Sequence, residues 1–228
     1  MSARRRLGIF GGTFDPIHLG HVEAAVAASQ AVGFGELRLL PSRLPPHRPQ
    51  EPCASGYHRF AMVALAVRTL DRVTVSDLEL MAPGRSYTSQ TLVRLLAAGH
   101  DPAELFFVTG ADAFAEIASW KDYPALLDRC HFVVITRPGH GAHGLARTLP
   151  ELSDRMIELS PSTPLDRVAD TPAIYLADAC TADVSSTDVR RRAARGASLE
   201  GLVPADVATY IRRQGLYGSG TSAADLHV

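Results

Sequence analysis

Short apolar runs alternate with longer stretches of helical character along almost the whole chain. The apolar runs predict strands at Leu7–Phe10, Glu36–Leu40, Arg72–Val75, Leu105–Thr109, Phe132–Thr136, Met156–Leu159 and Ala173–Leu176. The stretches between them predict helices at Leu19–Val32, Gly56–Leu70, Ser89–Ala98, Asp112–Ser119, Tyr123–Arg129, Ser186–Arg195 and Pro204–Arg213. This alternation predicts an α/β fold, a Rossmann-like, doubly wound parallel sheet with helices on both faces in a single domain.

The length of the chain and its pattern set the domain limits. A chain of 228 residues can bury a sizeable core. We expect one domain over residues 1–217, and a disordered tail over 218–228, because the residues from Gly218 lack apolar periodicity. Ligands of doubly wound sheets bind beyond the carboxyl ends of the strands. The segments that follow the strands are therefore where chemistry is expected.

Composition and charge narrow the class of protein. A formal net charge of −1 argues against nucleic-acid or membrane partners. Cys53, Cys130 and Cys180 are few, odd in number and far apart, which is typical of reduced thiols and not of a disulfide framework or metal cluster. The sequence contains no signal-peptide pattern and no run of about 18 apolar residues, so we expect a cytoplasmic protein. Whether it forms a homo-oligomer is left open.

The first predicted strand leads into Gly11–His21, with the sequence GGTFDPIHLGH. A strand, a glycine turn and a helix start point backbone N–H groups at one place, which is a ready anion site. His18 and His21 are three residues apart, lie on one helix face and suit a phosphate. The adjacent glycines do not fit the dinucleotide fingerprint, and no Gly-Lys-Ser/Thr follows as in a Walker A loop. A zinc pair would lack further ligands at the usual spacing.

A second candidate follows the last predicted strand, in Val184–Arg190 with the sequence VSSTDVR. Its Ser-Ser-Thr run supplies hydroxyl and N–H groups at a helix start, and Arg190 lies one turn inside. By itself the segment fits a helix N-cap followed by a solvated basic helix equally well.

Together the two segments resemble the signatures of the nicotinate-mononucleotide adenylyltransferase family of bacteria, within the HxGH nucleotidyltransferases. The resemblance covers about residues 6–217. Five inner motifs occur in family order: PPHR at 45–48, SYT at 86–88, GAD at 110–112, SWK at 119–121 and RPG at 137–139. The chain departs from the family at Arg48, where the family has lysine, which keeps the charge but alters its geometry. The loop after Ser160 is also a candidate insertion.

The resemblance implies adenylyl transfer from ATP to nicotinate mononucleotide, giving deamido-NAD and pyrophosphate in NAD biosynthesis. It implies Mg²⁺ that accompanies ATP, and no protein metal site. The implied catalytic residues are His18, His21 and Arg190. The implied ATP-binding residues are Gly11, Gly12, Thr13, Phe14, Gly110, Asp112, Arg137, Ser185, Ser186 and Thr187. The implied mononucleotide-binding residues are Asp15, His47, Arg48, Thr88, Trp120 and Lys121. In the family, the Trp120 position stacks on the nicotinate ring, and the backbone at Thr88 and Lys121 holds its carboxylate.

Several positions keep a structural alternative. Asp112 could instead be a helix N-cap, and Trp120 could be a partly buried core residue. Arg59 could be a solvated charge on a helix, in place of the supporting arginine that the family has there. Phosphopantetheine adenylyltransferases and cytidylyltransferases share the histidine chemistry. Aminoacyl-tRNA synthetases have a related HIGH motif, but this chain is short and has no recognisable KMSKS element. Two alternatives from other classes also remain: a nucleotide-binding sensor without catalytic activity, and a metal-binding HxxH protein.

Overall fold

A computed structural model describes residues 6–46, 50–136, 142–159 and 165–218. His47, Arg48, Arg137 and the predicted tail beyond Gly218 lie outside the described residues. No helix in the described ranges has the length and apolar character needed to cross a membrane.

Within these ranges, seven strands form one parallel sheet in the order β3-β2-β1-β4-β5-β7-β6. The strands are β1 (Leu7–Gly12), β2 (Glu36–Pro41), β3 (Val73–Val75), β4 (Leu105–Gly110), β5 (His131–Thr136), β6 (Met156–Glu158) and β7 (Ile174–Asp178). The order runs outward from β1 in one direction and from β4 in the other, so the topology switches between these two strands. The predicted doubly wound α/β fold is confirmed, and its switch point lies where β1 delivers the GGTF turn.

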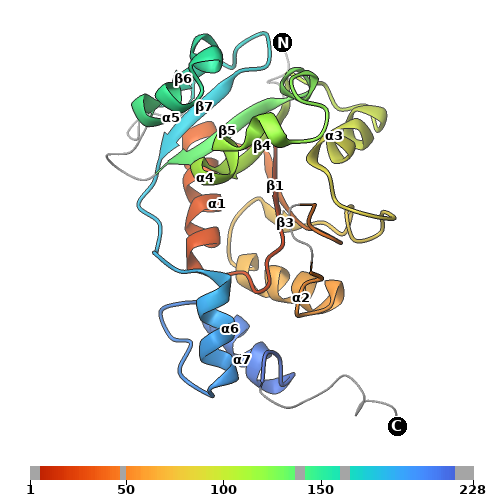
Figure 1. Cartoon of the computed structure of the whole chain (residues 1–228), viewed down its shortest axis with the longest axis vertical. Coiled ribbons are helices and arrows are strands. Elements are labelled where there is room, and N and C mark those ends of the chain that lie inside the picture. The colour runs from red at the N-terminus through yellow and green to blue at the C-terminus, as the bar shows by residue number, and fades with distance from the viewer. Residues whose placement is uncertain (1–5, 47–49, 137–141, 160–164, 219–228) are drawn as a thin grey trace.

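Helices cover both faces of the sheet (Figure 1). The α-helices are α1 (Leu19–Val32), α2 (Gly56–Val67), α3 (Thr88–Ala97), α4 (Ala111–Ala115), α5 (Ala142–Thr148), α6 (Ser186–Ala194) and α7 (Ala205–Arg213). The described residues also form the 3₁₀ turns η1 (Ile117–Ser119), η2 (Ala125–Asp128) and η3 (Pro150–Arg155).

Alternating residues of the central strands supply two separate cores. Phe10 and Phe106 pack with α1 and α2 on one face. Ile9 and Phe107 pack with α3, α4 and the 3₁₀ turns on the other. Because these strands are buried on both sides, they are nearly continuous apolar runs and not an alternating pattern.

Three local predictions were wrong. The predicted helix Asp112–Ser119 is the short α4 followed by η1, and Tyr123–Arg129 is only η2. Asp122 has φ 65°, a left-handed backbone that turns the chain between η1 and η2 and so separates the two 3₁₀ turns. The helix α5 and the turn η3 were missed, because the α5 sequence AHGLART has a glycine and few apolar residues from which to recognise a helical face.

The pair α6–α7 lies beyond the carboxyl ends of the strands, at the lower end of the molecule in Figure 1. The chain reaches α6 directly from β7, so Val184–Arg190 returns to the edge where the GGTF turn leaves β1.

Candidate active site

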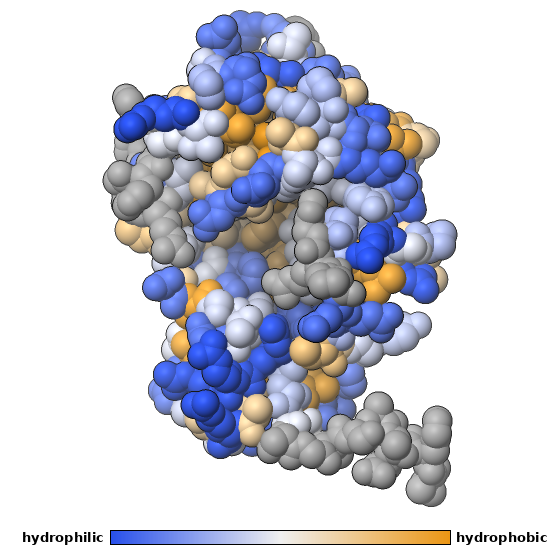
Figure 2. All heavy atoms as spheres, in the orientation of Figure 1, coloured by the Kyte–Doolittle hydropathy of each residue, from blue (hydrophilic) through white to orange (hydrophobic). Residues whose placement is uncertain are grey.

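A cavity of about 780 Å³ opens at the carboxyl ends of β1, β4 and β5. Its lining includes Gly11, Gly12, His18, Gly20, His21, Gly110, Asp112, Thr136, Thr181 and Ala182. The space-filling view is hollowed between the sheet and the α6–α7 pair (Figure 2). The cavity thus joins the GGTF turn, the histidine pair and the GAD turn at the topological switch point, where α/β sheets bind ligands.

The two histidines form a stacked pair. Their ring centroids are 3.7 Å apart with an interplanar angle of 29°. The His18 backbone N–H donates to His21 Nδ1 at 3.3 Å, so that nitrogen is an acceptor and the neutral ring carries its proton on Nε2. Burial lowers the pKa of His18 to about 4. Burial, and then the neighbouring His18, lower the pKa of His21 well below its usual value. At neutral pH both rings are therefore neutral hydrogen-bond donors in this structure.

Close packing explains the small and strained residues around the pair. Phe14 has φ 47° and meets the His21 ring edge-on at 5.1 Å. A Cβ on Gly12 would lie 2.7 Å from the Phe14 ring, and one on Gly20 would lie 2.9 Å from the Ala182 carbonyl oxygen. Glycines at these positions therefore let the turn and the helix start approach their neighbours.

The start of α1 offers fewer free donors than the sequence pattern suggests. Leu19 is the first helical residue, and its N–H donates to the Leu202 carbonyl at 2.9 Å. The loop between α6 and α7 thus caps the helix that carries the histidines. The Leu19 N–H is therefore already bonded, whereas the two imidazoles lie in the cavity lining.

The two signature segments meet although 170 residues separate them. Arg190 donates to the Asp15 carbonyl at 2.7 Å and to the Thr187 hydroxyl at 3.2 Å. The Ser186 hydroxyl donates to the Pro16 carbonyl at 2.9 Å. These bonds dock the start of α6 onto the loop that precedes His18.

Ser185 has the N-cap role that the sequence left open. Its hydroxyl accepts from the Asp188 N–H at 3.1 Å. The basic run that follows is partly paired, since Arg191 contacts Asp188 at 3.2 Å. The capping alternative therefore holds for Ser185, while Ser186 and Arg190 bind the opposite loop.

Asp15 is a structural hub. Its carboxylate is 3% exposed and accepts from the N–H groups of Cys53 and Ala54, at 2.7 and 3.1 Å, and from the Tyr217 hydroxyl at 2.8 Å. These bonds tie the loop after β1 to the end of the loop between β2 and α2, and to a tyrosine four residues beyond the end of α7. Its assignment to mononucleotide binding stays a prediction, and the structure gives its carboxylate an internal role.

Arg59 is 1% exposed, so the alternative of a solvated helix charge was wrong. It donates to the carbonyls of Ala54 at 3.1 Å, Thr13 at 2.7 Å and Arg43 at 3.4 Å. Burial lowers its pKa, and the Asp15 carboxylate opposes that shift. Arg59 thereby ties both ends of the loop between β2 and α2 to the GGTF turn, which is the supporting role that the resemblance implied.

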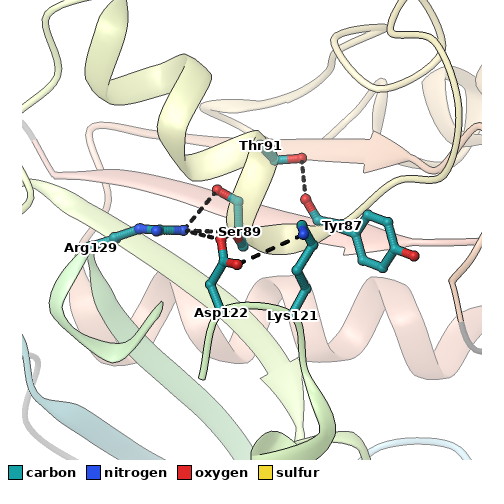
Figure 3. Close-up of polar contacts among 6 residues, drawn as sticks. All are labelled: Tyr87, Ser89, Thr91, Lys121, Asp122 and Arg129. Carbon is teal, nitrogen blue, oxygen red and sulfur yellow. Dashed lines mark hydrogen bonds and ion pairs between the residues drawn. The ribbon is translucent and has the colours of Figure 1, made fainter. Parts of the chain in front are cut away.

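On the other side of the sheet, the residues on either side of Thr88 contact Lys121 and Asp122. Tyr87 precedes α3 and gives it no side-chain cap. The Lys121 ammonium lies 5.6 Å from the centre of the Tyr87 ring (Figure 3). Trp120 is partly buried and meets Phe107 edge-on at 6.0 Å, so part of it packs on the core.

Several cavity residues were missed by the sequence reasoning. Thr136, Thr181 and Ala182 line the cavity. Only Thr136 could have been found from the sequence, because it is the last residue of a buried strand. Asp112 lines the cavity as an exposed residue in the first turn of α4. Within the described ranges, the buried Ser42 hydroxyl and His18 Nδ1 have no hydrogen-bond partner. Buried polar atoms without a partner are rare in folded proteins, and of these two residues His18 lines the cavity.

No group of three or more His, Cys, Asp or Glu residues that could hold a metal ion occurs in the part of the chain that the structure describes.

Comparisons with known proteins agree with this geometry. The cytidylyltransferase-like family matches residues 9–192. A probable nicotinate-nucleotide adenylyltransferase of Symbiobacterium thermophilum is 40% identical, covering 96% of this chain and 99% of that protein. One of Desulfatibacillum aliphaticivorans is 37% identical, with 93% and 99% covered. The Plasmodium falciparum nicotinic acid mononucleotide adenylyltransferase complexed with NaAD shares the fold, with a TM-score of 0.68 at 17% identity, covering 93% of this chain and 97% of that one.

Proposed function

The chain belongs to the nicotinate-nucleotide adenylyltransferases of the cytidylyltransferase-like family, and we propose from that premise that its adenylyl transfer is performed around His18 and His21. The reaction joins the adenylyl group of ATP to nicotinate mononucleotide and releases pyrophosphate, a step of NAD biosynthesis. The observation that carries the proposal is the meeting of the two signature segments, through Arg190 and Ser186, beside the stacked histidines.

This reaction depends on the positioning of the reacting phosphates and on stabilisation of their negative charge, more than on proton transfer. An oxygen of the mononucleotide 5′-phosphate attacks the α-phosphorus of ATP in line. The bond from that phosphorus to the β-phosphate oxygen breaks, and pyrophosphate leaves with the electron pair. The attacking phosphate is already an anion at neutral pH, so no general base is required.

His18 and His21 bind the reacting phosphates in this proposal. Both pKa values are lowered, so the rings act as neutral donors, and His21 presents Nε2–H because its Nδ1 already accepts from the His18 backbone. A donor that is already oriented costs no rearrangement when charge develops on the phosphates. Arg190 donates from Nη1 to the Asp15 carbonyl and from Nη2 to the Thr187 hydroxyl. In this proposal its remaining N–H groups and the start of α6 bind the leaving pyrophosphate.

The adenosine occupies the cavity between the GGTF turn and the GAD turn. Gly110 ends β4 and Asp112 follows it, so the carboxylate stands at the strand end where a ribose hydroxyl would bind. Gly11 and Gly12 line the opposite wall, and Thr13 and Phe14 continue the same turn. Outside the cavity lining, Ser185, Ser186 and Thr187 at the start of α6 are proposed to bind the phosphates of ATP. Arg137 is proposed to close over the nucleotide and lies outside the described residues.

The nicotinate ring binds near the start of α3 in this proposal. Backbone N–H groups at Thr88 and Lys121 hold its carboxylate, and Trp120 stacks on the ring. His47 and Arg48, which lie outside the described residues, are proposed to bind the mononucleotide phosphate. A carboxylate accepts on both oxygens, whereas a carboxamide presents an NH₂ to one donor at a cost of about 1–3 kcal/mol.

We propose that ATP enters as its Mg²⁺ complex, since magnesium keeps much of its water and binds chiefly through phosphates.

Pyrophosphate release with Mg-ATP and one acceptor at a time tests the proposal. The acceptors are nicotinate mononucleotide, nicotinamide mononucleotide and phosphopantetheine. Rapid release with the nicotinate form alone is expected. Equal rates with the first two would remove the carboxylate selectivity, and release with phosphopantetheine alone would reassign the substrate. Binding of ATP without release would favour a nucleotide sensor.

A further inference from the structure

A closed polar cluster joins three chain segments beside the start of α3 (Figure 3). It consists of Ser89, Asp122 and Arg129, and we call it the α3 staple. The Ser89 hydroxyl donates to Asp122 Oδ2. Arg129 donates to the Ser89 hydroxyl at 2.6 Å and to the same Asp122 oxygen at 3.1 Å. Each member therefore contacts the other two.

The staple differs from an ordinary surface ion pair in what it joins. Ser89 is 2% exposed and belongs to the first turn of α3, whereas Asp122 lies 33 residues later in an irregular turn. Exposed ion pairs contribute little to stability. The Ser89 hydroxyl first, and then Arg129, hold the pKa of Asp122 below its usual value, so the carboxylate stays ionised and keeps both partners.

The backbone at Asp122 needs such support. Its φ of 65° is in the left-handed region, which disfavours residues other than glycine. Lys121 is the preceding residue, and its ammonium lies 3.8 Å from Asp122 Oδ1. The bonds from Ser89 and Arg129 thus fix the turn that carries the Lys121 backbone relative to the start of α3.

We infer that Ser89, Asp122 and Arg129 are positioning residues that set selectivity for a pyridine carboxylate over a carboxamide. This inference rests on the proposed function, in which Thr88 and Lys121 each offer an N–H to one carboxylate. Two donors on separate segments discriminate between the groups only while their spacing is fixed. The cluster with Lys121 has two cations and one anion, so Asp122 does not leave a net negative charge near the substrate.

The test compares Asp122→Ala, Asp122→Asn and the control Asp128→Ala in steady-state pyrophosphate release. Asparagine keeps an oxygen that accepts from Ser89, and alanine does not. Asp128→Ala removes a different ion pair of the same segment, the 3.0 Å contact with Arg155. Each variant is assayed with nicotinate and with nicotinamide mononucleotide at saturating Mg-ATP, and its unfolding midpoint is recorded.

Asp122→Ala is expected to raise KM for nicotinate mononucleotide about tenfold and to lower the kcat/KM preference over the amide by about the same factor. kcat and KM for ATP should stay within about twofold. The asparagine variant and Asp128→Ala should keep the preference within about threefold of the wild type.

An unchanged preference in a folded Asp122→Ala, or an equal loss in Asp128→Ala, would overturn the inference. If Asp122→Ala does not fold, Ser89→Ala is judged by the same two criteria. A wild-type protein that releases no pyrophosphate with nicotinate mononucleotide would refute the proposed function itself, before any variant is compared, and the inference with it.

Discussion

Mild acid should destabilise this protein through its histidine pair. His18 is 8% exposed, and burial lowers its pKa from 6.5 to about 4. The folded state therefore binds the His18 proton less readily than the unfolded chain does. Because the folded pKa is depressed, the stability from this group is complete above about pH 6.5 and is lost as the pH falls toward 4.

The size of the effect follows from the two pKa values. At pH 5 nearly all unfolded chains carry a proton on His18, but only about a tenth of folded chains do. Between pH 7 and pH 5 this difference removes about 2 kcal/mol from the free energy of unfolding. His21, whose pKa is also lowered by burial, changes stability in the same direction.

Urea unfolding at pH 7 and pH 5, followed by circular dichroism, measures this loss. His18→Gln cannot titrate, so its loss between the two pH values should be about 2 kcal/mol smaller than that of the wild type. An equal loss in both proteins would show that His18 is not held neutral by burial, and would remove the argument that neutral imidazoles meet the phosphates.

Three further substitutions test separate contacts. His21→Ala should lower kcat for pyrophosphate release about a hundredfold with little change in the unfolding midpoint, and near-normal turnover would exclude His21 from the mechanism. Tyr217→Phe removes a hydroxyl that donates to Asp15 and should lower the free energy of urea unfolding by about 1–2 kcal/mol. An unchanged value would contradict the structural role given to the Asp15 carboxylate. Gly20→Ala places a Cβ 2.9 Å from a backbone oxygen and should cost about 1–3 kcal/mol in the same assay. Its control, Gly144→Ala in α5, meets no atom within 4 Å and should be neutral or stabilising.

Local signals predicted most of the fold. Buried parallel strands are apolar on both faces, so β1, β4 and β5 are apparent as continuous runs. The helices α1 and α6 start within motifs whose residue types are constrained by capping and by close packing. Where those signals were weak, as in α5, or where a left-handed residue turned the chain, as at Asp122, the prediction failed.

The site was predicted only as a set of separate segments. Nothing in the spacing of Arg59 distinguishes a solvated charge from a buried arginine that binds three carbonyls. Asp15 was assigned to a substrate on the basis of its motif, whereas its carboxylate is occupied by donors from two other parts of the chain. Both outcomes depend on neighbours that are distant in sequence.

The sequence by itself determined the succession of most strands and helices along the chain, the family and the candidate residues for phosphate binding, because these depend on periodicity and on local motifs. The tertiary structure alone decided which segments share an edge of the sheet, and therefore that Arg190 reaches Asp15 and that Ser89 reaches Asp122. The same packing excludes water from His18 and lowers its pKa, and so determines its charge state, which no residue type specifies.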